Sequence, residues 1–174
     1  MLIVFGGLPG VGKSTIAQNI VRKLSAVYLR IDSVEQALIR SGIDSTEIGP
    51  SGYVIGYAVA KDNLQLGLTV VADSVNPLEI TRQAWRNVAL EVGVQCIEIE
   101  LICSDHAEHR CRVESRTADI PGHQLPNWQN VLEREYETWD SEHLIVDTSM
   151  TSADQVVDAI VRNLKGISHG VQPC

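Results

Sequence analysis

The eight residues GLPGVGKS at positions 7–14 constrain the fold of this chain more than any other feature. They follow a short apolar run, residues 2–5, and precede apolar residues at helical spacing, so the sequence predicts a strand, a loop and a helix in that order. Glycine permits the positive φ values and the close backbone approach of a loop whose N–H groups point at phosphate oxygens. Lys13 adds a charge for the β- and γ-phosphates, and Ser14 offers a hydroxyl ligand to Mg²⁺. The segment therefore predicts a P-loop that binds a nucleoside triphosphate.

The loop and the start of the helix after it form the expected phosphate-binding segment. A helix N-terminus carries a partial positive charge and free backbone N–H groups, so both parts attract an anion. A flexible glycine-rich turn with an exposed lysine is the alternative, but it leaves the helical spacing of Ile16, Ile20 and Leu24 unexplained. The expected contacts in the loop are Gly7, Pro9, Gly10, Val11, Gly12, Lys13 and Ser14.

Composition limits the partners that this chain can take. A length of 174 residues, 44% of them hydrophobic, fits one compact domain. The formal net charge of −8 disfavours a nucleic-acid partner, because affinity for nucleic acids depends on clustered cations, and it favours a small substrate. The four cysteines lack paired spacing, and the N-terminal apolar run lacks a basic flank. We therefore expect a cytoplasmic protein with no signal peptide and no membrane span.

Short apolar runs alternate with amphipathic stretches along the chain. This alternation predicts an α/β fold with a five-stranded, mainly parallel sheet, helices on both faces, and ligands at the carboxyl ends of the strands. We expect a single domain over residues 1–165 and a flexible C-terminal tail over 166–174. One mismatch is that Glu98 and Glu100 alternate with apolar residues, a pattern typical of a half-exposed strand. The strand candidates are residues 2–5, 27–31, 68–72, 96–103 and 144–146.

Two helix starts carry capping signals. Asn76 precedes a proline and Glu79, and Ser152 precedes Gln155 by three residues. In each pair the first side chain can accept a hydrogen bond from a backbone N–H of the first helical turn, and the second side chain can accept one from the backbone N–H of the first residue. Both segments therefore predict a helix N-terminus.

Two carboxylates follow strand candidates directly. Asp32 comes after the second strand, where it can accept or orient the proton of an attacking hydroxyl; a helix cap shared with Glu35 is the alternative. Asp73 ends the third strand and is the expected carboxylate for Mg²⁺, with a turn aspartate as the alternative. The next residue is Ser74 rather than a second acid that could activate water, which favours a transferase over an ATPase motor.

Three arginines, Arg110, Arg112 and Arg116, fall on an expected helix after the fourth strand. Arg112 and Arg116 would share one helix face, and an anion between them would relieve their repulsion. The next segment, 117–127, contains two prolines and a glycine and could form a flap that excludes water. A solvated helix face, neutralised by nearby glutamates, is the alternative.

Two weaker signals remain open. Cys103, His106, His109 and Cys111 suggest a metal site, but their spacing spreads them over different faces of a helix. Tyr53 and Tyr57 share a helix face, and either could line an acceptor pocket, although core packing is the favoured interpretation.

Five segments of the chain resemble the bacterial P-loop kinase family of AAA-type ATP-binding proteins. This family is similar to zeta toxins, chloramphenicol phosphotransferase, gluconate kinase, adenylylsulfate kinase and polynucleotide 5′-kinase. The resemblance implies the strand order 2-3-1-4-5 and an arginine-bearing lid over about 104–127. The segments are GLPGVGKST, LRIDSVEQAL, VVADSVNP, HRCRVESRTADIPGH and HLIVDTS.

The resemblance also implies roles for individual residues. Lys13, Ser14 and Thr15 would bind phosphates and Mg²⁺, and Asp32 would serve the acceptor hydroxyl. Arg112 and Arg116 would belong to the lid. The residues expected near the adenine are Asp147, Thr148 and Ser149.

These signals together predict an ATP- and Mg²⁺-dependent kinase that transfers the γ-phosphoryl group to a hydroxyl of a small molecule. One alternative is a nucleotide-binding ATPase or switch that has no acceptor. The other is a polynucleotide 5′-hydroxyl kinase, which the acidic balance disfavours although residues 110–116 could form a local basic groove. Members of the family phosphorylate unrelated molecules, so membership does not define the acceptor.

Overall fold

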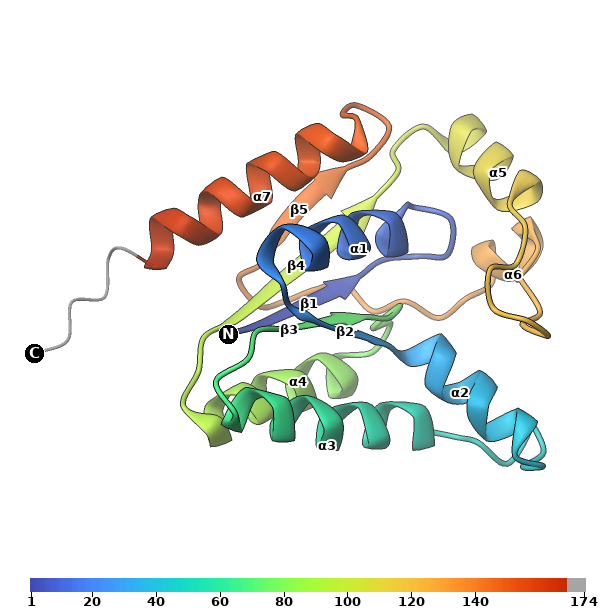
Figure 1. Ribbon diagram of the computed structural model, residues 1–174. Coiled ribbons are helices and arrows are strands. Elements are labelled where there is room, and N and C mark those ends of the chain that lie inside the picture. Colours follow the sequence, from blue (N-terminus) through green and yellow to red (C-terminus); the bar gives the residue numbers. More distant parts are fainter. Residues whose placement is uncertain (169–174) are drawn as a thin grey trace, which may run out of the picture.

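The computed structural model describes residues 1–168, with residues 163 and 165–168 described by their backbone alone. Its centre is a five-stranded sheet in which every neighbouring pair is parallel (Figure 1). The strand order β2-β3-β1-β4-β5 is the predicted one. The strands are β1 (Leu2–Gly6), β2 (Val27–Arg30), β3 (Val70–Asp73), β4 (Cys96–Ile102) and β5 (Leu144–Asp147).

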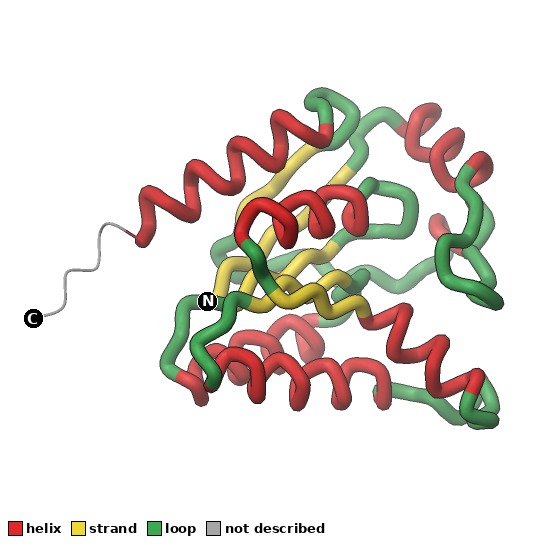
Figure 2. The backbone as a smooth tube through the Cα atoms, viewed as in Figure 1, coloured by secondary structure: helices red, strands yellow, loops and turns green. Residues whose placement is uncertain are grey.

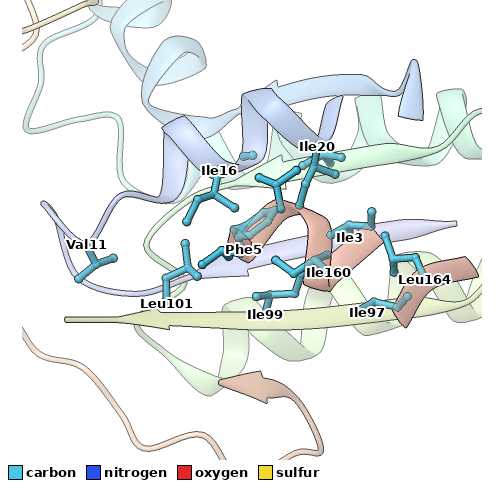
Figure 3. Close-up of a cluster of buried hydrophobic side chains, with 14 of the residues drawn as sticks. Ile3, Phe5, Val11, Ile16, Ile20, Ile97, Ile99, Leu101, Ile160 and Leu164 are labelled. Atoms are coloured by element: carbon cyan, nitrogen blue, oxygen red, sulfur yellow. The ribbon is translucent and has the colours of Figure 1, made fainter. Parts of the chain in front are cut away.

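Helices cover both faces of the sheet (Figure 1). On one face α1 and α7 pack over β1 and β4, and Figure 3 shows how their apolar side chains interleave with those of the two strands. On the other face α2, α3 and α4 enclose a second apolar cluster. Because both faces of β1 are covered, its five residues are all buried, as expected for a central parallel strand. The helices are α1 (Lys13–Leu24), α2 (Ile31–Arg40), α3 (Ser51–Gln65), α4 (Glu79–Val92), α5 (His106–Ser115), α6 (Trp128–Leu132) and α7 (Ala153–Ser168).

A polar layer explains the alternating glutamates of β4. One face of this strand contributes apolar residues to the core, while Glu98 and Glu100 point to the other face. There Glu98 accepts hydrogen bonds from Arg86 and Ser141, both at 3.0 Å, and Glu100 accepts one from Tyr136 at 2.9 Å. The pattern is therefore not a sign of an exposed strand, because paired donors satisfy both carboxylates within the fold.

One of the two predicted capping pairs forms. Ser152 and Gln155 exchange hydrogen bonds at the start of α7. Helix α4 instead begins at Glu79 with Leu78 in the cap position, so the cap predicted at Asn76 is wrong. Asn76 is fully buried, donates to the carbonyl of Phe5 at 2.7 Å, and accepts a hydrogen bond from the Trp85 indole at 3.1 Å. Burial between β1 and α4 thus overrides the local capping signal.

Helix α7 continues through Ser168, so residues 166–168 of the expected tail are helical, whereas residues 169–174 lie outside the described part of the chain. Within residues 1–168, no helix has the length and the apolar character that crossing a membrane requires.

Candidate active site

A cavity of about 1050 Å³ opens at the carboxyl ends of the strands, where loops from distant parts of the sequence meet (Figure 2). The P-loop, the ends of β2 and β3, and the loops after α5 and β5 line it. Gly7, Asp147 and Ser149 do not belong to its lining. The predicted site residues that line the cavity are Pro9, Gly10, Val11, Gly12, Lys13, Ser14, Thr15, Asp32, Asp73, Arg112, Arg116 and Thr148.

The P-loop takes the backbone conformation that its glycines allow. Gly7, Gly10 and Gly12 have φ values of 130°, 88° and 96°, which side-chain-bearing residues rarely adopt. A Cβ at Gly7 would lie 2.2 Å from the carbonyl oxygen of Leu101, and the amide of Gly7 donates to Val75. Gly7 therefore fixes the loop against the sheet, while the later glycines face the cavity.

Lys13 lies inside the loop with only 9% of its surface exposed. Its Nζ donates to the carbonyl of Leu8 at 2.9 Å. Burial lowers the pKa of Lys13 to about 8, although the charges of Asp73 and Asp32 act in the opposite direction. An anion placed beside the ammonium would raise this pKa again and stabilise the charge, so the site favours a polyphosphate.

Asp73 is 2% exposed at the end of β3 and accepts a hydrogen bond from the Tyr28 hydroxyl at 2.6 Å. Burial and the charge of Asp73 raise the pKa of Tyr28, so the phenol remains a donor. Ser14 lines the same cavity. A carboxylate and a hydroxyl are hard oxygen ligands that suit Mg²⁺, which usually keeps several waters and binds through one or two carboxylates and phosphate oxygens. The residues present therefore fit a magnesium ion.

Asp32 lies in the first turn of α2, whose cap position is occupied by the backbone of Arg30. No side chain caps this helix, so the cap proposed for Asp32 with Glu35 does not form. One carboxylate oxygen of Asp32 lies 3.6 Å from the Nε of Arg30. The side chain is 37% exposed and lines the cavity, so an acceptor can reach it.

Arg112 and Arg116 have different environments because α5 ends at Ser115. Arg116 occupies the C-terminal cap position, where the backbone is already extended, so the prediction that Arg112 and Arg116 share one helix face is wrong. Arg112 donates to the side-chain and backbone oxygens of Thr148 at 2.9 and 3.0 Å and pairs with Glu108. It thus ties α5 to the loop after β5.

Arg116 carries two buried donors that lack a partner. Its Nε and Nη2 atoms are shielded from solvent and form no hydrogen bond with any described residue. Burial lowers the pKa of this guanidinium. Unpaired buried donors are costly, and Arg116 belongs to the lining of the same cavity as the P-loop. The arrangement favours an anion at this point, whereas Arg110 pairs with Glu114 away from this cavity.

An ion pair holds the segment after α5 over the cavity. Arg30, at the end of β2, forms a two-pronged pair with Asp119, at 2.5 and 3.1 Å. Residues 117, 119 and 123–126 of the same segment line the cavity. The expected flap is therefore closed against the end of β2 by a contact that joins residues 89 positions apart.

The two open signals are explained by local contacts. Tyr53 lines the cavity, and its hydroxyl accepts a hydrogen bond from the amide of Asn76 at 3.2 Å. Tyr57 packs edge-on against Trp85, with ring centres 4.5 Å apart. The ring Nε2 of His109 lies 2.8 Å from the carbonyl of Pro9, so this histidine joins α5 to the P-loop. No group of three or more metal-binding side chains occurs among residues 1–168.

The loop expected near the adenine is held by its own hydrogen bonds. Asp147 accepts from the amides of Ser104 and Ser149 at 3.1 and 3.0 Å, and hydrogen bonds from both serines hold the pKa of this carboxyl well below its usual range. Thr148 lines the cavity together with residues 151–153. Asp147 and Ser149 thus shape the loop, and Thr148 faces the site.

Sequence reasoning missed several residues of the cavity wall. Glu35 follows Asp32 at i,i+3, and this spacing could have placed it on the same helix face. Arg30 and Asp119 lie in segments that carry the resemblance, but no spacing in the sequence places them beside each other, and Arg134 lies outside those segments. These residues are Arg30, Glu35, Asp119 and Arg134.

Comparisons with known proteins agree with this geometry. A family model described as an AAA domain matches residues 2–134. A candidate kinase from Chloroflexus aurantiacus is similar in structure, with a TM-score of 0.75, 21% identity, and coverage of 95% of this chain and 96% of the other. No curated protein matches the sequence significantly.

Two further structures share the fold. The APS kinase CysC of Mycobacterium tuberculosis, solved with AMPPNP and APS, gives a TM-score of 0.69 at 20% identity, covering 94% of this chain and 96% of that one. A gluconokinase from Sinorhizobium meliloti gives 0.65 at 18% identity, covering 98% and 97%. These similarities confirm the predicted P-loop kinase fold.

Proposed function

Because the chain belongs to the AAA domain family, we propose that it is an ATP- and Mg²⁺-dependent phosphotransferase that moves the γ-phosphoryl group of ATP to a hydroxyl of a small molecule. The observation that carries the proposal is the pair of buried, unpaired donors on Arg116, a residue that lines one cavity with the P-loop and Asp32. A phosphoryl group in transfer is the anion that such donors stabilise.

The P-loop half of the cavity would hold the triphosphate. Backbone N–H groups of the loop and the start of α1 face the phosphates, and Lys13 contributes a charge. Ser14 and Asp73 would hold Mg²⁺, which when bound neutralises charge on the β- and γ-phosphates. Thr148 would lie near the adenine, and ATP is the proposed nucleotide because the related APS kinase binds AMPPNP.

The opposite half would hold the acceptor. Its hydroxyl oxygen attacks the γ-phosphorus, the bond to the β–γ bridging oxygen breaks, and ADP leaves. Asp32 orients the hydroxyl and accepts its proton. Arg112 and Arg116 would stabilise charge on the phosphoryl group, and the flap after α5 would exclude water. Residues 116–127 would be the moving part of the lid expected over 104–127.

A small acceptor is favoured over a polynucleotide. The formal net charge of −8 disfavours a polyanion, and the wall away from the P-loop carries the carboxylates of Asp32, Glu35 and Asp119 beside its arginines rather than a continuous basic surface. The related APS kinase and gluconokinase are named for small substrates. The three described cysteines are free thiols, which agrees with our placement of the protein in the cytoplasm.

Incubation with γ-labelled ATP and Mg²⁺ tests the proposal. Wild-type protein is offered sugars, polyols, amino alcohols and, separately, 5′-hydroxyl oligonucleotides, and the label is followed by chromatography. Transfer to a small compound, slowed in Asp32→Asn while ATP binding is retained, supports the proposal. Release of free phosphate alone supports an ATPase or switch, and label on the oligonucleotide supports a polynucleotide kinase.

A further inference from the structure

Glu35 is a cavity carboxylate with a fixed side-chain stem. It lies one turn after Asp32 on α2, and both side chains line the cavity. The stem crosses the bare backbone of Gly52 on α3, where an added Cβ would come within 2.4 Å of Glu35 Cγ. The absence of a side chain at position 52 thus gives Glu35 the room to lie where it does.

The carboxylate of Glu35 is unpaired. No described residue donates a hydrogen bond to it or forms an ion pair with it, whereas Asp73 and Asp119 each have a donor. Burial, and then the charge of Asp32, raise the pKa of Glu35, and the charge of Arg134 only partly offsets this effect. Asp32 keeps its ion pair with Arg30, whereas Glu35, one turn later, faces the cavity without an ion pair of its own.

The nearby arginines do not supply that cation. The guanidinium of Arg30 is occupied by Asp119 through both of its terminal nitrogens. Arg134 is exposed and makes no ion pair with a described residue. Arg30 is thus occupied by two aspartates and Arg134 is solvated, while the unpaired donors of Arg116 are assigned above to the phosphoryl group.

A buried serine lies in the same cavity. Ser74 is 4% exposed, follows Asp73 directly and belongs to the cavity lining. Its hydroxyl interacts with the hydroxyl of Tyr53, which lines the same cavity. The two hydroxyls therefore form a polar part of the wall.

We propose that Glu35 makes this site select an acceptor that carries a protonated amine close to its reacting hydroxyl. The inference rests on the proposed phosphotransfer and names the acceptor class. The ammonium is bound by Glu35, and the neighbouring hydroxyl is oriented by Asp32. Neutral polyols could hydrogen-bond to the same groups, but they would leave the negative charge of Glu35 uncompensated.

The transfer step balances without another reactant. The hydroxyl oxygen of the amino alcohol bonds to the γ-phosphorus as the bond to the β–γ bridging oxygen breaks. The hydroxyl proton passes to Asp32, and ADP and the phosphorylated amino alcohol leave. The amine stays protonated throughout and does not react.

Matched acceptor pairs test the inference. Serinol is compared with glycerol, and D-glucosamine with D-glucose, by kcat/KM for label transfer from ATP. The wild type is expected to prefer the amine member by about 10- to 100-fold, the range of a hydrogen bond to a charged group. Glu35→Gln should bring the preference close to one. Glu47→Gln, which changes an exposed glutamate outside the cavity, should leave it unchanged.

A second measurement does not depend on turnover. Serinol, D-glucosamine, glycerol and D-glucose are each titrated into protein saturated with Mg²⁺ and AMPPNP, and the heat of binding is recorded for the wild type and for Glu35→Gln. Binding of the amines that Glu35→Gln loses supports the inference. Equal binding of glycerol and glucose, amine preference retained in Glu35→Gln, or no amine bound would each overturn it.

The nucleotide titration separates the two proposals. If the wild type binds Mg²⁺–AMPPNP but ignores the amines, the acceptor class is wrong and the nucleotide site stands. If it binds no nucleotide, the proposed function itself fails. Thermal melting of both variants establishes that each one is folded before its result is used.

Discussion

Removing the side chain of Asn76 should destabilise the domain strongly, because two buried hydrogen bonds depend on it. The amide donates to the carbonyl of Phe5 at 2.7 Å and accepts from the Trp85 indole at 3.1 Å, with Asn76 fully buried. Asn76→Ala leaves both partners unsatisfied in the interior, at about 1–3 kcal/mol each. The residue also has φ 49°, and alanine costs about 1 kcal/mol or more in this left-handed region.

The expected loss is therefore about 3–7 kcal/mol, out of a total stability of about 5–15 kcal/mol for a domain. Urea unfolding followed by circular dichroism measures the change. Asn76→Gly is the matched control, since it loses the same hydrogen bonds but tolerates the positive φ and should be less destabilised than the alanine variant. A loss below about 1 kcal/mol for Asn76→Ala would refute the hydrogen-bond accounting.

Three further outcomes are expected at the nucleotide and acceptor sites. Lys13→Ala should abolish turnover and weaken ATP binding. In the wild type the pKa of Lys13 is lowered to about 8 in the free protein, so ATP affinity should fall by up to about tenfold per pH unit above pH 8. Calorimetry in this pH range should detect proton uptake on binding. Asp32→Asn should leave ATP affinity near the wild-type value and slow transfer, and unchanged turnover would remove its catalytic role. Tyr28→Phe deletes the hydroxyl that positions Asp73, so the Mg²⁺-dependent part of ATP affinity should fall while Mg²⁺-free binding stays the same.

The fold was predictable because its signals are local. The P-loop and the alternation of short apolar runs with amphipathic stretches each predict strands, loops and helices from a few neighbouring residues. The rules for helices that connect parallel strands then restrict the possible topologies. The order of the strands came from the resemblance. The position of Asp32 and Asp73 in the cavity wall was predictable because each lies at or just after the end of a strand, and strand ends share one edge of the sheet.

The rest depends on tertiary contacts that no local window contains. The pairs Arg30–Asp119 and Glu35–Gly52 join segments that only the completed fold brings together. Asn76 carries a helix-capping signal, yet its side chain is drawn into the interior by Phe5 and Trp85. The end of α5 illustrates the same limit, because periodicity extends a helix through Arg116 whereas the backbone leaves it at Ser115.

The central claim is that the two buried, unpaired donors of Arg116 face the phosphoryl group in transfer. The affinity for Mg²⁺–ADP–aluminium fluoride, a mimic of the transferring phosphoryl group, tests it without knowledge of the acceptor. Arg116→Ala should weaken binding of this complex by about 10³-fold or more, the lower end of what a catalytic arginine contributes, while Mg²⁺–AMPPNP affinity changes little. Equal losses for both ligands, or no loss for either, would contradict the account.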